Sequence, residues 1–145
     1  NIRVVNRSQK MPKLDVDTGK MCRVFINIVK NAFEAMPKGG ELTITSEKAN
    51  ENLVFRFADT GVGIAEETFA RLWTPLFTTK AKGMGFGLPI CKRIVEAHGG
   101  KILAESQFGK GTTFTLIVPI KPEIRADGKI WVNVPESMLS TTVES

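Results

Sequence analysis

The sequence lacks the features that mark several common classes of protein. No segment approaches the roughly 20 consecutive apolar residues of a membrane-spanning helix, and residues 1–7 contain no apolar core of a signal peptide. The two cysteines, Cys22 and Cys91, fit neither a disulfide framework nor the spacing of metal ligands. We therefore expect reduced thiols, a cytoplasmic location and no direct membrane contact by this part of the protein. A membrane anchor elsewhere in a longer parent chain is compatible with these features.

Positive charge is spread along the chain rather than concentrated. The formal net charge is +5, but no run of five or six lysines and arginines occurs, so we expect no nucleic-acid partner. One denser pair, Lys80 and Lys82, is flanked by threonines and glycines and suits a phosphate group better than a DNA surface.

With 145 residues, 42% of them hydrophobic, the chain is long enough for one domain with a core and too short for two.

Hydrophobic periodicity and turn residues predict an α/β (α+β) order of elements. The predicted strands are residues 2–5, 13–16, 41–46, 53–58, 101–105 and 112–119. The predicted helices are residues 17 or 18 to 36, 66–73 and 87–98, with a long loop at 74–85. This order favours a two-layer sandwich over a doubly wound sheet. We expect the domain to occupy residues 1–121, and an extension at 122–145 to contain a possible short hairpin (124–134) and a frayed end (137–145).

The first predicted helix has an unusual distribution of polar residues. Apolar residues cover most of its circumference, which predicts a mostly buried helix with one polar stripe. That stripe contains Arg23, Asn27, Lys30, Asn31 and Glu34. Asn27 and Asn31 are one turn apart and point the same way, and their carboxamide oxygens suit Mg²⁺. The alternative is a solvated stripe with two incidental asparagines.

Two glycine-rich segments suit a nucleotide. Asp59, Gly61 and Gly63 follow a predicted strand directly, where a carboxylate can accept a hydrogen bond from an exocyclic amine and glycines admit a flat ring. Residues 83–88 lead into the last predicted helix, whose first backbone N–H groups favour an anion. Neither a P-loop nor a Rossmann fingerprint is present. Each segment alone is also compatible with an ordinary turn.

Four ordered motifs together resemble the boxes of the histidine kinase ATPase family, which also includes DNA gyrase, the MutL repair proteins and the heat-shock chaperone ATPases. The motifs are Asn27-x-x-x-Asn31, Asp59-x-Gly61-x-Gly63, residues 73–80 and Gly83-x-Gly85-x-Gly87-Leu88. The resemblance covers residues 13–119. It implies a Bergerat ATP-binding fold, in which helices pack on one face of a mixed, mostly antiparallel sheet and hold ATP under a mobile lid.

The resemblance assigns roles to individual residues. Asn31 is similar to the Mg²⁺ ligand, Asp59 to the adenine-binding aspartate, and Lys80 to a lysine that reaches the γ-phosphate. The expected catalytic residues are Asn27, Asn31 and Lys80. The expected nucleotide-binding residues are Asn27, Lys30, Asn31, Glu34, Asp59, Gly61, Gly63, Ile64, Phe77, Thr78, Thr79, Lys80, Gly83, Met84, Gly85, Phe86, Gly87, Leu88, and Thr112 or Thr113. Trp73 occupies an aromatic position where phenylalanine is commoner, and Glu34 stands where many sensor kinases have lysine.

Within this family, Asn27 favours a kinase over a hydrolase. Hydrolase branches place a glutamate there as general base, and an amide cannot take a proton at neutral pH. The only histidine, His98, precedes Gly99-Gly100 and is similar to the family's structural helix stop.

The resemblance implies ATP and Mg²⁺ as cofactors. We also expect the phosphate-accepting histidine to lie on a separate dimerisation domain, which passes the phosphate to a response regulator, and this chain alone not to phosphorylate itself.

Two other hypotheses remain open at this stage. One is a serine- or threonine-directed kinase of the same fold, of the anti-sigma-factor type. Asn27 argues against it, as does Thr78-Thr79-Lys80, which resembles the Thr-Thr-Lys of nitrogen-regulation-type kinases. The other is a binding module, either a nucleotide-sensing pseudokinase or a basic domain that contacts acidic partners. A strongly salt-dependent affinity for DNA would favour the basic domain.

Overall fold

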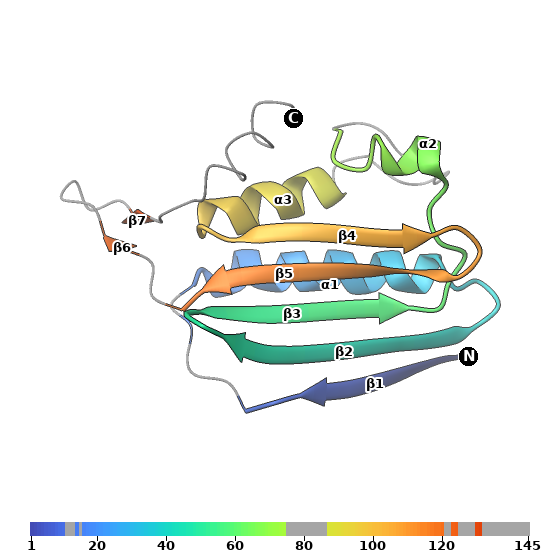
Figure 1. Ribbon diagram of the computed structural model, residues 1–145, viewed down its shortest axis with the longest axis horizontal. Helices are drawn as coiled ribbons and strands as arrows, with labels where there is room; N and C mark the ends of the chain where they lie inside the picture. Colours follow the sequence, from blue (N-terminus) through green and yellow to red (C-terminus); the bar gives the residue numbers. More distant parts are fainter. Residues whose placement is uncertain (11–13, 15, 75–86, 121–122, 125–129, 132–145) are drawn as a thin grey trace.

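The structure is a computed structural model that describes residues 1–10, 14, 16–74, 87–120, 123–124 and 130–131. The strands are β1 (Ile2–Ser8), β2 (Gly40–Ala49), β3 (Asn52–Asp59), β4 (Lys101–Gln107), β5 (Gly111–Pro119), β6 (Glu123–Ile124) and β7 (Ile130–Trp131). The helices are α1 (Thr18–Glu34), α2 (Glu66–Phe69) and α3 (Gly87–Ala97). Figure 1 shows their arrangement.

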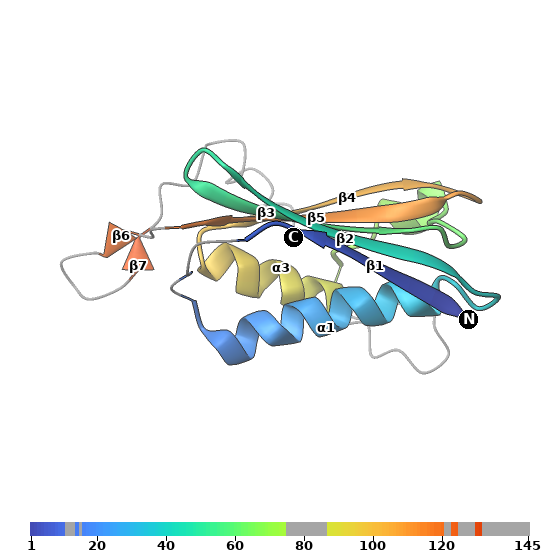
Figure 2. The ribbon, with the colours of Figure 1, turned by 90° about the horizontal axis from the view of Figure 1, so that it is seen from below.

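The architecture is a two-layer sandwich. Five strands form one sheet in the order β1-β2-β3-β5-β4, in which β1 pairs with β2 in parallel and the remaining pairs are antiparallel. The two longer helices, α1 and α3, both lie on the same face of this sheet (Figure 2). The predicted fold class is therefore confirmed. No helix in the described part of the chain is long and apolar enough to cross a bilayer.

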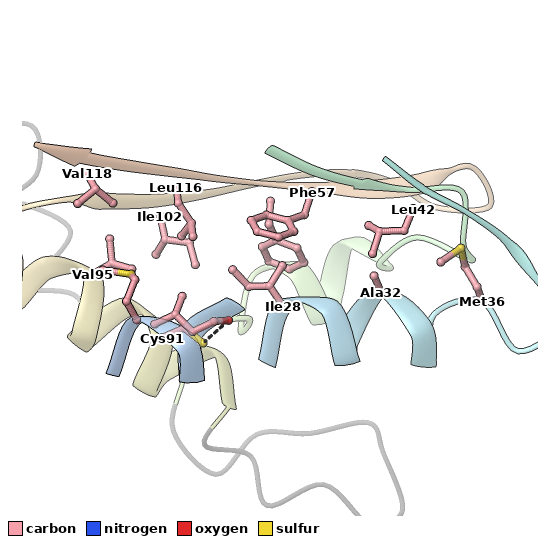
Figure 3. Packing of buried hydrophobic residues seen from close by; sticks show 13 residues of the cluster. Ile28, Ala32, Met36, Leu42, Phe57, Cys91, Val95, Ile102, Leu116 and Val118 are labelled. Atoms are coloured by element: carbon pink, nitrogen blue, oxygen red, sulfur yellow. Dashed lines mark hydrogen bonds between the residues drawn. The ribbon is translucent and has the colours of Figure 1, made fainter. Parts of the chain in front are cut away.

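The core lies between the sheet and the two helices (Figure 3). Alternate residues of β5, from Thr112 to Val118, are buried against the helices, as a strand with one covered face requires. The apolar members of the core cluster are Met21, Val24, Ile28, Ala32, Met36, Leu42, Phe57, Cys91, Val95, Ile102, Phe114, Leu116 and Val118. Because residues from every layer interdigitate here, the site described below rests on a rigid base.

Helix α1 begins where the sequence predicted but is less buried than predicted. Asp17 caps it, since the Asp17 side chain accepts a hydrogen bond from the Lys20 N–H at 3.0 Å. Ile26 and Phe33, however, are 65% and 42% exposed. The helix touches the sheet on one side and α3 on one flank only, so apolar residues on its remaining flank stay in contact with solvent.

Several predicted elements differ in extent, and β1 and β2 are both longer than predicted. In the predicted strand at 13–16, the described residues Leu14 and Val16 lie outside regular structure, because β1 already pairs with β2 along its whole length to Ser8. Helix α2 ends at Phe69 instead of residue 73, and residues 70–73 form turns. The β4–β5 hairpin is longer than predicted and closes at the pair Gln107 and Gly111.

Beyond the sheet, β6 and β7 pair antiparallel, with Glu123 opposite Trp131 and Ile124 opposite Ile130. This pairing overlaps the segment 124–134 where a hairpin was expected and begins one residue earlier. The expected frayed end at 137–145 lies outside the described residues. The domain boundary at residue 121 remains a prediction.

Candidate functional site

Asp59, the last residue of β3, is a buried carboxylate at one end of the sheet. The residue is 8% exposed, and its Oδ1 accepts hydrogen bonds from the backbone N–H groups of Gly61 at 2.9 Å and Thr112 at 3.2 Å. No group in the described part of the chain donates a hydrogen bond to Oδ2. The second oxygen is therefore an acceptor for an N–H group that a ligand would bring.

The environment of Asp59 disfavours its charge. Burial raises the pKa of the carboxyl above its ordinary value of 3.8, and the hydrogen bonds from Gly61 and Thr112 offset part of this rise. A buried carboxylate with a raised pKa gains more from an additional hydrogen-bond donor than an exposed one does. Such perturbed groups are concentrated at functional sites.

The loop after Asp59 is clamped between α1 and the β4–β5 turn. The Val62 N–H donates to the carbonyl oxygen of Ala35 at 2.9 Å, and the Gly109 N–H donates to the carbonyl oxygen of Val62 at 2.7 Å. An added Cβ at Gly61 would collide with the same Ala35 carbonyl, so only glycine fits there. The end of α1, the end of β3 and the β4–β5 turn lie at one end of the sheet (Figure 1). The loop thus occupies the junction of three elements.

The register of β5 places Thr112 and Thr113, the two threonines expected near the nucleotide, on opposite faces of the sheet. Thr112 pairs with Asp59 and is 4% exposed on the inner face, whereas Thr113 follows on the opposite face. The Thr112 Oγ1 lies 2.9 Å from Ser106 Oγ, which also accepts a hydrogen bond from the Ile64 N–H at 2.8 Å. Thr112 is therefore the threonine that contacts Asp59, while Thr113 borders the same end of the sheet. The structure also adds Ser106, which sequence reasoning missed.

These polar residues border a depression of about 340 Å³ at the ends of β3, β4 and β5. Its polar lining residues include Asp59, Glu105, Ser106, Lys110, Thr112 and Thr113. Two carboxylates, three hydroxyls and an ammonium group give this surface both hydrogen-bond donors and acceptors. It suits a polar ligand with an N–H group, such as a heterocyclic base.

A second, apolar depression of about 480 Å³ lies on the exposed flank of α1. It is lined by Phe25, Ile26, Val29, Lys30, Phe33 and Glu34. It is larger, but its only charged lining residues are Lys30 and Glu34, which are exposed on the helix surface. We therefore place the candidate site at Asp59.

The predicted polar stripe of α1 divides between two flanks. Asn27 and Asn31 are half-buried, and Asn27 hydrogen-bonds Cys91 of α3. Asn31 lies one turn before Ala35, whose carbonyl oxygen holds the Asp59 loop. Lys30 and Glu34 instead border the apolar depression. The binding roles of all four residues remain predictions.

The model of the family described as histidine kinase-, DNA gyrase B-, and HSP90-like ATPases matches residues 16–122. The chain belongs to this family. The match contains Asp59, its loop, the β4–β5 hairpin and α1, which are the elements that build the candidate site. Membership of this ATPase family implies that the domain binds ATP.

Three individual relatives are named as kinases, and two of them as histidine kinases. Sporulation kinase C of Bacillus subtilis (strain 168) is 43% identical over 107 residues, which cover 74% of this chain and 25% of that protein. Sensor histidine kinase ZraS of Escherichia coli (strain K12) is 38% identical over 110 residues, covering 76% and 24%. The solved catalytic domain of histidine kinase ThkA is 34% identical, has a TM-score of 0.73, and the match covers 82% of this chain and 79% of that one. The chain spans about a quarter of the length of these curated relatives and is a histidine kinase catalytic domain.

The single histidine of this ATPase domain has a structural role. His98 Nε2 accepts a hydrogen bond from the Asp17 N–H at 3.0 Å, and Nδ1 lies 2.7 Å from the Ile94 carbonyl oxygen. These contacts require the neutral tautomer with hydrogen on Nδ1. The ring therefore ties the end of α3 to the N-cap of α1, which extends the predicted role as a helix stop.

The aromatic residue that precedes the undescribed segment 75–86 is anchored in the core. The Trp73 ring meets the Phe114 ring edge to face, with centroids 6.4 Å apart, and Lys92 Nζ lies 6.0 Å from the Trp73 centroid. Trp73 thus fixes the chain where it leaves α2. The predicted ligands Phe77, Thr78, Thr79, Lys80, Gly83, Met84, Gly85 and Phe86 lie outside the described residues. Gly87 and Leu88 form the first turn of α3.

The two thiols should differ sharply in reactivity. Burial raises the pKa of Cys91 to about 11, against smaller lowering effects of Asn27 and Arg23, and its Sγ lies 3.8 Å from the Val24 carbonyl oxygen (Figure 3). Cys22 is exposed. With Ellman's reagent at neutral pH, Cys22 should react within minutes and Cys91 only on unfolding. A Cys22→Ser variant that still reacts quickly would contradict this burial.

Proposed function

We propose that this domain binds Mg-ATP at the Asp59 site and supplies the γ-phosphate to a histidine on a separate phosphoacceptor domain of a longer parent chain. The phosphate would then pass to a response regulator in two-component signalling. The observation that supports the proposal best is the buried Asp59 carboxylate, whose Oδ1 is fixed by two backbone N–H groups. Its Oδ2 would accept a hydrogen bond from the exocyclic amine of adenine, while Gly61 and Gly63 let the loop pack closely against Ala35 and the β4–β5 turn.

The residues near the phosphates also fit a kinase. Asn27 stands on α1 where a hydrolase needs a carboxylate base, and its amide cannot activate water. A neutral imidazole needs no such base, because its nitrogen is already nucleophilic. His98 is not suited to accept the phosphate, since both of its ring nitrogens are engaged within the fold.

Magnesium fits this site as an ion that is held largely by the nucleotide. Among the described residues, no three histidine, cysteine, aspartate or glutamate side chains form a metal-binding group. Mg²⁺ prefers oxygen ligands, keeps several waters and is usually bound through one or two protein oxygens together with phosphates. The carboxamide oxygen of Asn31 would provide such a ligand. Bound Mg²⁺ would neutralise charge on the phosphates.

Replacing Asn31 with alanine should lower the affinity for ATP about tenfold or more in Mg²⁺ and leave the affinity in EDTA almost unchanged. The reason is that the proposed ligand matters only when the metal is present. Calorimetric titration in both buffers measures the difference. Asn6→Ala, which removes an amide from the edge strand β1, is the matched control. An unchanged response of Asn31→Ala to Mg²⁺ would remove the metal role.

The kinase proposal is tested on the parent chain that contains this domain, incubated with γ-labelled ATP. We expect a phosphoprotein that is labile in acid and stable in alkali, as a phosphohistidine is. An acid-stable phosphoester would instead support the serine- or threonine-directed alternative. The isolated domain, incubated in the same way, should bind ATP and remain unlabelled, and label on His98 would contradict the account.

A further inference from the structure

Ser106 lies at a point where three separate segments meet. It is the penultimate residue of β4, opposite Thr112 of β5. Its Oγ accepts a hydrogen bond from the Ile64 N–H at 2.8 Å, donates to the Gly111 carbonyl oxygen at 3.1 Å, and lies 2.9 Å from Thr112 Oγ1. One hydroxyl therefore links the loop that follows Asp59 to the β4–β5 hairpin.

The hydrogens available at Ser106 restrict what Thr112 can present to a ligand. A serine hydroxyl has one hydrogen and two lone pairs, and the Ile64 N–H takes one lone pair. If the hydrogen goes to Gly111, Thr112 donates its own hydrogen to the second lone pair and offers only an acceptor. If the hydrogen goes to Thr112, the Thr112 hydroxyl keeps a hydrogen to donate. Ser106 thus controls the hydrogen-bonding character of Thr112.

Ser106 also supports both groups that fix Asp59. The Asp59 carboxylate is held by the N–H groups of Gly61 and Thr112. Gly61 belongs to the loop that ends at Ile64, which Ser106 binds, and Thr112 is bound by Ser106 directly. Loss of the Ser106 hydroxyl leaves the Ile64 N–H without its partner and frees the Thr112 hydroxyl to rotate. Both changes make the two N–H groups that hold the Asp59 carboxylate less firmly positioned.

We propose that Ser106 is a positioning residue that determines base specificity at the Asp59 site. It acts through Ile64 and Thr112 rather than by any step of phosphate transfer. The proposal rests on the proposed function, because it presupposes that an adenine nucleotide binds here. It predicts that discrimination between an amine and a carbonyl at position 6 of the purine depends on Ser106.

The experiment compares wild type, Ser106→Ala and Ser46→Ala by titration with ADP and with inosine diphosphate, together with thermal unfolding without ligand. Ser46 is a buried hydroxyl on β2, so its replacement is the same chemical change away from the site. Ser106→Ala should raise the Kd for ADP about tenfold and should lower the preference for ADP over inosine diphosphate. Ser46→Ala should change neither quantity.

The outcomes distinguish a failure of the proposed function from a failure of the role proposed for Ser106. A wild-type domain that does not bind ADP contradicts the proposed function and this inference with it. A wild type that binds ADP selectively, together with a Ser106→Ala variant of equal affinity and selectivity, overturns only the inference. If Ser106→Ala loses thermal stability and affinity but keeps its preference for ADP, its role is only structural and the inference is also overturned.

Discussion

Replacing Asp59 with asparagine should lower the affinity for ADP by about 100-fold or more, because a site built to accept a hydrogen bond then presents a donor to the adenine amine. The amide oxygen of asparagine can still accept the two N–H bonds from Gly61 and Thr112. The geometry of the loop is therefore expected to survive. Inosine diphosphate, which has a carbonyl in place of the amine, should lose much less affinity or gain some.

The same substitution should leave the unliganded domain as stable as wild type or more stable. Burial raises the pKa of Asp59 in the folded state above 3.8, so ionisation disfavours folding relative to the unfolded chain. The contribution of the carboxyl to stability is highest at acidic pH and declines as the pH rises through the folded-state pKa. At neutral pH an uncharged asparagine avoids this cost.

Calorimetric titration with the two nucleotides and thermal unfolding without ligand measure both effects. Asp17→Asn is the matched control, since Asp17 is exposed and asparagine also caps helices well. Unchanged ADP affinity in Asp59→Asn would refute the assignment of the base site. A large loss of stability in the unliganded variant would show instead that the charge itself supports the fold.

Replacing Gly63 with alanine should destabilise the domain by about 3 kcal/mol or more and abolish nucleotide binding. Gly63 has φ +73°, and an added Cβ would collide with the carbonyl oxygen of Gln107. The Cβ would also lie 2.9 Å from the Phe108 Cα. Because these are backbone atoms of the β4–β5 turn, relief of the collision must push the loop away from the hairpin that carries Thr112.

Gly109→Ala provides a matched control for the backbone conformation. Gly109 has a similar φ of +84°, but no heavy atom lies within 4 Å of an added Cβ. Its replacement should lower the free energy of unfolding by only about 1–2 kcal/mol, which is the cost of holding alanine in the left-handed conformation. ADP binding should remain nearly intact. Urea unfolding and ADP titration compare the two variants. Equal losses in both would show that the contact between the loop and the hairpin does not matter.

The sequence predicted well those features that depend on local spacing. The alternation in β2 and β3, the cap at Asp17 and the conjunction of Asp59 with two glycines each follow from short-range patterns. The helix layer on one face of the sheet followed from the family resemblance. These predictions needed no knowledge of which strands are neighbours.

Features that depend on strand register could not be predicted from the sequence. Thr112 and Thr113 are equivalent until the pairing with Asp59 places one of them on the inner face. Ser106 contacts the Ile64 N–H across 42 residues, and His98 contacts the Asp17 N–H across 81. A serine inside a strand carries no spacing signal for such a contact. The exposure of the apolar flank of α1 was also missed, since a helical wheel does not show which flank lacks a neighbour.

The most direct test of the central claim is a ¹H–¹⁵N NMR titration of the domain with ADP. Saturable shifts of the Gly61, Ile64 and Thr112 amides are expected, because these N–H groups build the base site. The amides of Ile26 and Phe33 at the apolar depression should not move. Saturable shifts centred on that flank of α1, with Gly61 and Thr112 unchanged, would contradict the account.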